Sequence, residues 1–234
     1  MQTFSLPFDD PRPAASLPEG FLWRKQALDL TAQRRLWGAL LKVLEAAPPA
    51  QNRTKGGGLT SAAMTNCGPA GWWSDTKGYR YVTANPATGL AWPPFPVEFI
   101  ELVKMVTEES PWPDFTPDSC LINFYGPGAK MGLHQDRDER DFSHPIITIC
   151  LGDDADFMVG TFARTDKPEA LRVQSGDVLL MGGASRMRFH GIRKIHPGTS
   201  PLPDIAGRYS LTFRKALYAE RRAHEHRSHH PIAV

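Results

Sequence analysis

The stretch from Leu121 to Asp138, LINFYGPGAKMGLHQDRD, constrains the fold more than any other part of this chain. Its first five residues alternate between two faces, a Gly-Pro pair follows, and a second extended segment carries His134-Gln135-Asp136. Side chains that alternate with a period of two are typical of a β-strand, and Gly with Pro favours a turn. The stretch therefore predicts two short strands joined by a tight connection.

The same pattern continues to the end of the chain, with Gly- or Asp-rich turns between short extended segments. We expect strands near residues 120–125, 131–134, 145–151, 157–162, 170–173, 177–181, 186–190 and 207–214. About eight short strands at this spacing favour an antiparallel sandwich or jelly roll. Upstream, apolar residues with helical spacing predict helices over 29–47 and from 97 to before Pro111. The predicted fold class is mainly β (α+β), a double-stranded β-helix (jelly roll) core with N-terminal helices packed on it.

The length of 234 residues suits one domain. Within it we expect an N-terminal extension (1–118), a catalytic core (119–217) and a charged, His-rich tail (218–234) that is disordered. The three cysteines, Cys67, Cys120 and Cys150, form no C-x-x-C pair, which favours reduced thiols. The sequence has no signal-peptide pattern and no apolar run of roughly 20 residues. We therefore expect a cytoplasmic protein with no membrane partner, working as a monomer.

A histidine and an aspartate two residues apart on extended backbone point to the same side. His134 and Asp136 could therefore supply two of the three ligands of a facial triad, an arrangement that holds Fe(II) and leaves open positions. The third ligand could be His190, which we place at the end of the predicted strand 186–190. His144 and His196 are further candidates, and composition alone does not choose among the three.

The last predicted strand has an unusual polar face. That face carries Arg208, Ser210, Thr212 and Arg214, and the other carries Tyr209, Leu211 and Phe213. A buried arginine without a partner costs several kcal/mol, so each arginine needs an anion. The anion could be a carboxylate of a ligand, held through two parallel hydrogen bonds, or an acidic side chain of the protein itself. Asn123 and Tyr125 add polar groups to an inward face nearby, which together suit 2-oxoglutarate.

Residues 60–82 place aromatic side chains among Gly, Asn and Ser. One interpretation is a nucleotide-recognition lid, because every nucleobase has a flat face that can stack on an aromatic ring. The other is a core hairpin with Trp73 and Tyr81 packed inward, and this segment alone does not decide between them. In an extended segment Trp72 and Trp73 face opposite ways, so we expect Trp72 at the site and Trp73 in the core.

Several separated motifs occur in a fixed order: N-x-Y-x-P-G-A-K (123–130), L-H-Q-D-x-D (133–138), H-G-I (190–192) and R-Y-x-L-T-F-R (208–214). In this order they resemble the AlkB family of Fe(II)/2-oxoglutarate-dependent dioxygenases, most of all its bacterial branch. The resemblance extends upstream to the M-T-N-C-G segment (64–68) and the lid. It implies that His134, Asp136 and His190 bind iron.

The resemblance also implies a set of cosubstrate and substrate contacts. Arg208 and Arg214 would hold the carboxylates of 2-oxoglutarate, with Asn123, Tyr125 and Ser210 assisting. Trp72 and His134 would sandwich a flipped base, Asp138 would meet its exocyclic amino group, and the further contacts would be Met64, Tyr79 and Arg164. Two positions depart from the bacterial pattern, namely Ser210 in place of an Asn and Met181 in place of a Trp.

The activity that the resemblance implies is repair of alkylated nucleic acid. With Fe(II), 2-oxoglutarate and O₂ as cofactors, it would demethylate bases such as 1-methyladenine and 3-methylcytosine in DNA, single-stranded or duplex, and in RNA. The products would be formaldehyde, succinate and CO₂. An alternative is a jelly-roll 2-oxoglutarate oxygenase that hydroxylates a protein or a small molecule. A third is a non-catalytic nucleic-acid-binding module with zinc in the site.

Overall fold

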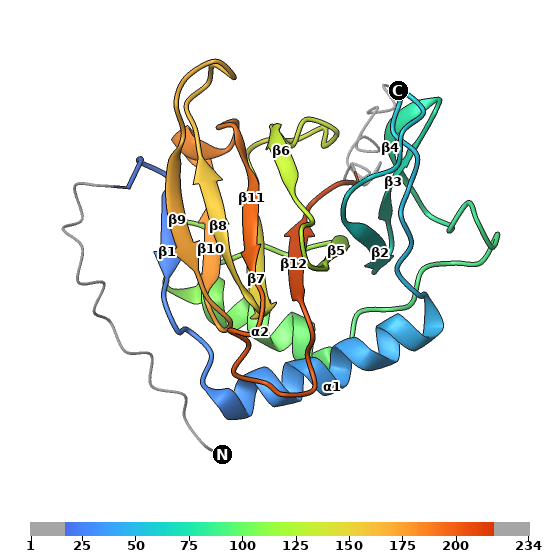
Figure 1. Ribbon diagram of the computed structural model, residues 1–234, viewed down its shortest axis with the longest axis horizontal. Coiled ribbons are helices and arrows are strands. Elements are labelled where there is room, and N and C mark those ends of the chain that lie inside the picture. Colours follow the sequence, from blue (N-terminus) through green and yellow to red (C-terminus); the bar gives the residue numbers. More distant parts are fainter. Residues whose placement is uncertain (1–16, 218–234) are drawn as a thin grey trace, which may run out of the picture.

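Two antiparallel β-sheets face each other in the computed structural model, which describes residues 17–217 (Figure 1). The larger has the strand order β1-β10-β7-β12-β5-β2 and the smaller β6-β11-β8-β9. Their bounds are β1 (Phe21–Arg24), β2 (Ala63–Cys67), β5 (Ser119–Tyr125), β6 (Met131–His134), β7 (Ile146–Gly152), β8 (Asp154–Val159), β9 (Glu169–Val173), β10 (Val178–Met181), β11 (His190–His196) and β12 (Arg208–Arg214). The predicted jelly roll is confirmed. The predicted tail, 218–234, lies outside the described residues.

Two helices, α1 (Leu30–Ala46) and α2 (Val97–Glu108), cover the outer face of the larger sheet (Figure 1). Asp29 begins α1 by accepting a hydrogen bond from the Ala32 amide at 2.7 Å, as an N-cap does. The outward side chains of β12 pack beneath the helices: Phe213 meets Phe99 edge-on with ring centroids 5.8 Å apart. Both helices were predicted from apolar spacing, and both are confirmed.

The opposite face of the larger sheet turns toward the smaller sheet. Leu121 and Tyr125 belong to the core between the sheets, whereas Ile122 belongs to the core under the helices. The predicted alternation of β5 is thus confirmed, with Asn123 on the inward side. In β12 the same alternation turns the polar face of residues 208–214 inward, so the two strands carry polar groups into one interior space.

Residues 71–82 form a separate two-stranded sheet, β3 (Gly71–Asp75) paired with β4 (Gly78–Val82). This lid hairpin stands beside the end of the sandwich at which β6 ends, and the β8–β9 connection rises on the other side of that end (Figure 1). Within the hairpin Trp72 lies opposite Tyr81. The segment from 60 to 82 is therefore a projecting hairpin, with β2 leading from the larger sheet into it.

The strand predicted at 186–190 is wrong. A short 3-10 helix, η2 (Gly183–Ser185), and a turn precede His190, which begins β11 instead of ending a strand. The backbone amides of Ser185, Arg186 and Arg188 each donate to the carbonyl three residues earlier, so they are used within the turn and not in a strand ladder. The strand predicted at 157–162 occurs earlier, as β8.

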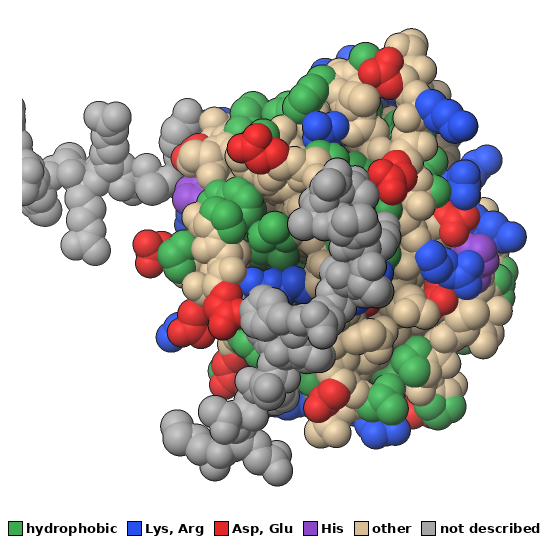
Figure 2. Space-filling view, turned by 90° about the vertical axis from the view of Figure 1, so that its left-hand side faces the viewer, with side chains coloured by type: hydrophobic (Ala, Val, Ile, Leu, Met, Phe, Trp, Pro, Cys, Tyr) green, Lys and Arg blue, Asp and Glu red, His purple; other side chains and the backbone are tan. Residues whose placement is uncertain are grey.

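Figure 2 shows the face on which β1 and β9 lie, with acidic and basic side chains interspersed over its described part. This mixture agrees with a formal net charge of only +2. Among the helices of residues 17–217, none is long and apolar enough to cross a membrane.

Candidate active site

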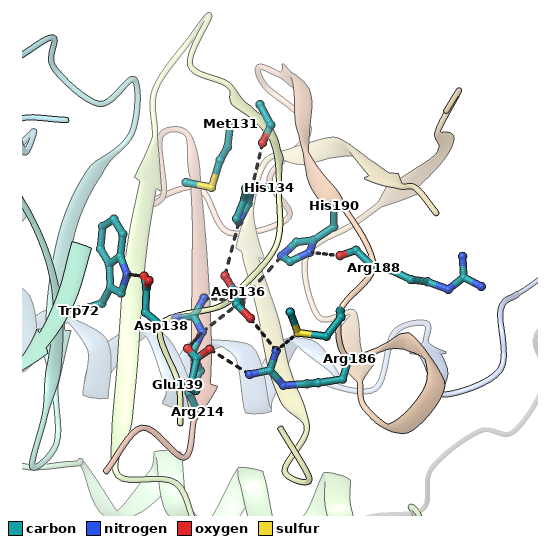
Figure 3. Close-up of polar contacts among 12 residues, drawn as sticks. Trp72, Met131, His134, Asp136, Asp138, Glu139, Arg186, Arg188, His190 and Arg214 are labelled. Atoms are coloured by element: carbon teal, nitrogen blue, oxygen red, sulfur yellow. Dashed lines mark hydrogen bonds and ion pairs between the residues drawn. The ribbon is translucent and has the colours of Figure 1, made fainter. Parts of the chain in front are cut away.

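The two imidazoles of the predicted triad lie side by side where two strands meet. His134 is the last residue of β6 and His190 the first of β11, and the two are register partners with ring centroids 4.4 Å apart. Asp136 follows β6 and places its carboxylate 3.7 Å from His134 Nε2 and 3.9 Å from His190 Nε2. The ligand atoms of the three residues all lie within 4.8 Å of one another (Figure 3).

Backbone carbonyls fix both rings in the orientation that a metal requires. Nδ1 of His134 lies 3.0 Å from the Gly132 oxygen, and Nδ1 of His190 lies 3.1 Å from the Arg188 oxygen. A carbonyl can only accept, so each Nδ1 carries the proton and each Nε2 offers a lone pair. Burial lowers the pKa of His190 to about 4, so this imidazole is neutral at pH 7.

The two remaining histidine candidates for the third ligand lie away from the triad. His144 Nε2 is 3.7 Å from a carboxylate oxygen of Asp141, three residues earlier in the chain. His196, at the far end of β11, is bonded to Asp156 at 2.9 Å. Each of these imidazoles therefore has an acidic partner of its own, and the geometry selects His190.

Asp136 also contacts Arg214, which donates to its Oδ2 from Nε at 3.1 Å and from Nη2 at 2.8 Å. Burial alone would raise the pKa of Asp136, but the positive charge of Arg214 and then the two imidazoles outweigh it. The pKa of this carboxyl is therefore well below its usual range. Asp136 is ionised throughout the physiological range, as a metal ligand must be.

Behind Asp136 lies a buried ion network that the sequence did not reveal. Glu139, of which only 4% is exposed, is 3.0 Å from Arg186 and 3.3 Å from Arg214, and accepts a hydrogen bond from the Tyr81 hydroxyl. In the sequence Glu139 belongs to the run D-R-D-E-R, which resembles a solvated turn. The network joins the lid hairpin, through Tyr81, to the arginine that contacts Asp136.

A cavity of about 750 Å³ opens above the triad. It brings together most of the residues singled out in the sequence, namely Met64, Trp72, Tyr79, Asn123, Tyr125, His134, Asp136, Asp138, Arg164, His190, Ser210 and Arg214. Arg208 is the one that does not reach the lining. Its side chain is fully buried and donates to the Asp153 carbonyl at 3.1 Å and to Cys150 Sγ at 2.8 Å.

Two buried polar atoms at the floor of this cavity lack a hydrogen-bond partner among the described residues. They are Nη1 of Arg214 and Oδ1 of Asn123, and Nε of Arg208, which lies behind the lining, is also unpaired. An unsatisfied buried donor is costly, on the order of 1–3 kcal/mol. Nη1 of Arg214 is thus an unpaired donor at the cavity floor, and it fits a carboxylate oxygen of a dicarboxylate ligand. The predicted contact from Arg208 is not formed at this cavity, and Oδ1 of Asn123 is an acceptor that cannot bind a carboxylate.

The lid side of the cavity is aromatic. Trp72 stacks on Tyr79 with centroids 5.5 Å apart and an angle of 17° between the planes, and its indole donates to Asp138 Oδ2 at 2.6 Å (Figure 3). Trp73 is not in the core, so that prediction is wrong: it is half-buried and donates to Asp75 at 3.1 Å. A two-stranded hairpin leaves its second face near solvent, and no core lies there to receive the ring.

Comparisons with known proteins agree with this geometry. Residues 20–214 match the family model described as 2OG-Fe(II) oxygenase superfamily. The chain is 44% identical over 208 residues to the "Alpha-ketoglutarate-dependent dioxygenase AlkB homolog" of Caulobacter vibrioides, covering 89% of this chain and 92% of that protein. It is also 44% identical over 174 residues to "Alpha-ketoglutarate-dependent dioxygenase AlkB" of Escherichia coli K12, covering 74% and 80%.

This chain belongs to the AlkB family. The solved structure of OsALKBH1 superposes with a TM-score of 0.74 at 30% identity, covering 85% of this chain and 98% of that one. A "DNA N(6)-methyladenine demethylase ALKBH1C" of Arabidopsis thaliana is 37% identical over 60% of this chain and 36% of its own length. The AlkB-family chain is therefore a 2-oxoglutarate-dependent Fe(II) dioxygenase.

In this AlkB-family enzyme the three-residue cluster His134, Asp136 and His190 fits Fe(II). Bound iron and 2-oxoglutarate supply the oxidising power, by coupling decarboxylation of the cosubstrate to the reduction of O₂. The chain would hold the metal with the carboxylate of Asp136, kept ionised by Arg214, and with two oriented imidazoles. Of the two departures from the bacterial pattern, Ser210 lines the cavity and Met181 packs between the sheets.

The Arg214→Lys variant is expected to need much more 2-oxoglutarate for half-maximal turnover. A lysine is a point charge and cannot reproduce the planar fork, and losing one charge-assisted hydrogen bond costs roughly 1.5–3 kcal/mol. The titration of activity against 2-oxoglutarate measures the effect, with Arg193→Lys, an exposed ion-pair arginine on β11, as the control. An unchanged titration for Arg214→Lys would show that Arg214 serves only its ion pairs with Asp136 and Glu139.

Proposed function

We propose that this AlkB-family enzyme repairs alkylated nucleic acid by oxidative demethylation of bases, with 1-methyladenine and 3-methylcytosine in DNA as its substrates and RNA as a second polymer. The observation that carries the proposal is the aromatic wall beside the triad. Trp72 and Tyr79 form a flat stacked pair at the same cavity as the metal-binding histidines. A flat wall of this kind suits a nucleobase better than a peptide or an aliphatic acid.

The names of relatives add support for a nucleic-acid substrate. The Arabidopsis relative is named a DNA demethylase, and the AlkB proteins of two bacteria match most of this chain. A base inside a duplex cannot reach a buried metal, so the enzyme must take it out of the stack. Methylation at a pairing position weakens the base pair and lowers this cost, which favours damaged bases over intact ones.

Four residues of this chain would contact such a base. Trp72 on the lid and His134 at the triad would lie against its two faces, and Met64 would close the apolar side of the cavity. Asp138 would accept a hydrogen bond from the exocyclic amino group of adenine or cytosine. In the structure Asp138 instead accepts from Trp72 Nε1, so the base would replace or share this partner. The reacting methyl group would then face the three metal ligands.

A single assay tests the proposal. The purified chain is incubated with Fe(II), ascorbate, 2-oxoglutarate and O₂ and an oligonucleotide that contains 1-methyladenine, and repaired base, formaldehyde and succinate are measured. We expect all three products in equal amounts. Succinate without base repair would favour an oxygenase that acts on a protein or a small molecule, and the absence of succinate would favour a zinc-containing binding module.

The Trp72→Ala variant is expected to bind the methylated oligonucleotide more weakly by roughly 1–3 kcal/mol, the usual contribution of one base–aromatic stack. The affinity for 2-oxoglutarate should hardly change, because Trp72 lies on the lid and Arg214 on β12. The matched control is Trp73→Ala, whose indole contacts Asp75 and not the cavity. Fluorescence anisotropy measures both affinities. A larger loss for Trp73→Ala than for Trp72→Ala would contradict the assignment of the stacking residue.

We also propose that the enzyme works in the cytoplasm. Cys67, Cys120 and Cys150 are all buried free thiols. An odd, low number of cysteines without a C-x-x-C pair is typical of reduced thiols in a cytosolic protein, and this supports the proposal.

A further inference from the structure

An exposed phenylalanine stands on the side of the cavity mouth opposite the lid hairpin. Phe162 lies in the connection between β8 and β9, which Figure 1 shows rising on the far side of β6 and β11 from β3 and β4. Its side chain is 58% exposed, more than any other phenylalanine of residues 17–217.

One face of the Phe162 ring is already covered by a cation. The guanidinium carbon of Arg188 lies 4.9 Å from the ring centroid, a cation–π contact. Because 58% of the side chain is exposed, much of the ring remains accessible to a flat ligand. An aromatic ring with an arginine on one side is the arrangement on which bases of single strands stack.

The platform is fixed relative to the metal site. Arg188 Nη1 donates to the Gly160 carbonyl at 3.0 Å, while its own carbonyl accepts from His190 Nδ1 at 3.1 Å. The Phe189 amide donates to Thr161 at 2.9 Å, and the Gly160 amide to Phe189 at 2.7 Å. A Cβ at Gly160 would lie 3.0 Å from the Phe189 oxygen, so the two segments are in close contact. Phe162 is therefore held by the same turn that carries a metal ligand.

Two basic side chains of this connection can contact phosphates, although Asp166 lies between them in the sequence. Arg164, two residues after Phe162, lines the cavity, and Lys167 follows in the same exposed connection. Basic side chains at this place can contact phosphates on either side of a base that has entered the cavity. The Thr161 hydroxyl contacts Asp166 across the connection, which holds the two ends of this short loop together beside Phe162.

We propose that Phe162, supported by Arg188, is a nucleobase-stacking site for the nucleotide adjacent to the reacting one. This inference rests on the proposed function, because it requires a polynucleotide substrate. The reacting base enters the cavity between Trp72 and His134, and its neighbour in the strand remains outside and stacks on the free face of Phe162. The site takes any base, because stacking uses the flat face that all bases share. It gives the enzyme a preference for a lesion within a strand over a free nucleotide.

The test compares two substrates that carry the same lesion. One is the mononucleotide 1-methyl-dAMP, and the other is a five-nucleotide DNA strand with 1-methyladenine at its centre. In Phe162→Ala we expect kcat/KM for the strand to fall about tenfold, which corresponds to ~1.4 kcal/mol, and kcat/KM for the mononucleotide to stay unchanged. Leu41→Ala, another exposed apolar position (46%), on α1 at the other end of the molecule, is the control and should change neither.

A second arm removes the partner base instead of the ring. Two further strands carry an abasic nucleotide next to the lesion, one on the 5′ side and one on the 3′ side. With the wild-type enzyme, kcat/KM should fall by the same factor for one of these two strands and stay unchanged for the other. With Phe162→Ala, kcat/KM for the abasic strand should equal that for the intact strand, because the stacking contact is already absent. An equal loss on strand and mononucleotide, or additive losses in the second arm, would overturn the inference. If the wild type repairs neither substrate, the proposed function fails and the stacking site with it.

Discussion

His190→Ala is expected to lower turnover by more than about 100-fold, since loss of a metal ligand should exceed the 10- to 100-fold effect of losing a ligand's outer partner. His190 supplies one of only two imidazoles at the triad, and its Nε2 is directed toward Asp136. A water molecule that replaces the imidazole cannot restore the affinity of the site for Fe(II). Fe(II) content after dialysis should fall in parallel with turnover, and the circular dichroism spectrum should stay native.

Two histidines outside the triad provide matched controls. His196 lies at the opposite end of β11 and is bonded to Asp156, and the side chain of His144 is partly exposed beside Asp141. His196→Ala and His144→Ala should therefore keep their iron and their activity. Normal demethylation by His190→Ala, together with a loss in either control, would assign the third ligand to a histidine other than His190.

The second large effect concerns stability. Glu139→Gln is expected to lower the free energy of unfolding by about 3 kcal/mol or more, because it leaves Arg186 and Arg214 without their shared buried counter-charge. For a chain of this size, that loss lowers the melting temperature by on the order of 10 °C. Differential scanning calorimetry in the absence of cosubstrate measures it, so that ligand binding does not contribute.

Glu101→Gln is the control for this change. Glu101 also forms an ion pair with an arginine, Arg35, at 2.6 Å, but both side chains are more than half exposed. Exposed pairs typically contribute less than about 1 kcal/mol, because water and salt screen the charges. Equal melting temperatures for the two variants would show that the network around Glu139 is not held by charge.

Most strands of the two sheets and most residues of the cavity lining could be predicted from the sequence. Residues on β5 and β12 show their faces by strict alternation, so the inward position of Asn123 and Ser210 could be predicted. Both helices likewise show their spacing in local sequence. His134 and Asp136 could be paired because their separation of two residues is a local geometric quantity.

Contacts between distant segments were not predictable in this way. Glu139 is buried only because Tyr81, Arg186 and Arg214 come from three other segments to meet it. Residues 186–189 alternate between polar and apolar side chains in the sequence, as a strand does, but they form a turn in the structure. We predicted Trp73 in the core because its side chain points away from that of Trp72. The direction of a side chain does not show whether other residues pack against that face of the hairpin.

The place of β12 in the larger sheet has a consequence for hydrogen exchange. This strand is paired on both sides, with β7 and β5, along nearly its full length, and it carries Ser210 and Arg214 into the cavity. Amide protons of such a strand exchange with solvent mainly when the whole domain unfolds, whereas those of a two-stranded hairpin exchange through local opening. Ser210 and Arg214, which we expect to contact the cosubstrate, should thus share the longest protection among the described residues. Those of β3 and β4 should exchange early, so the entrance can open repeatedly while the floor of the site keeps its geometry.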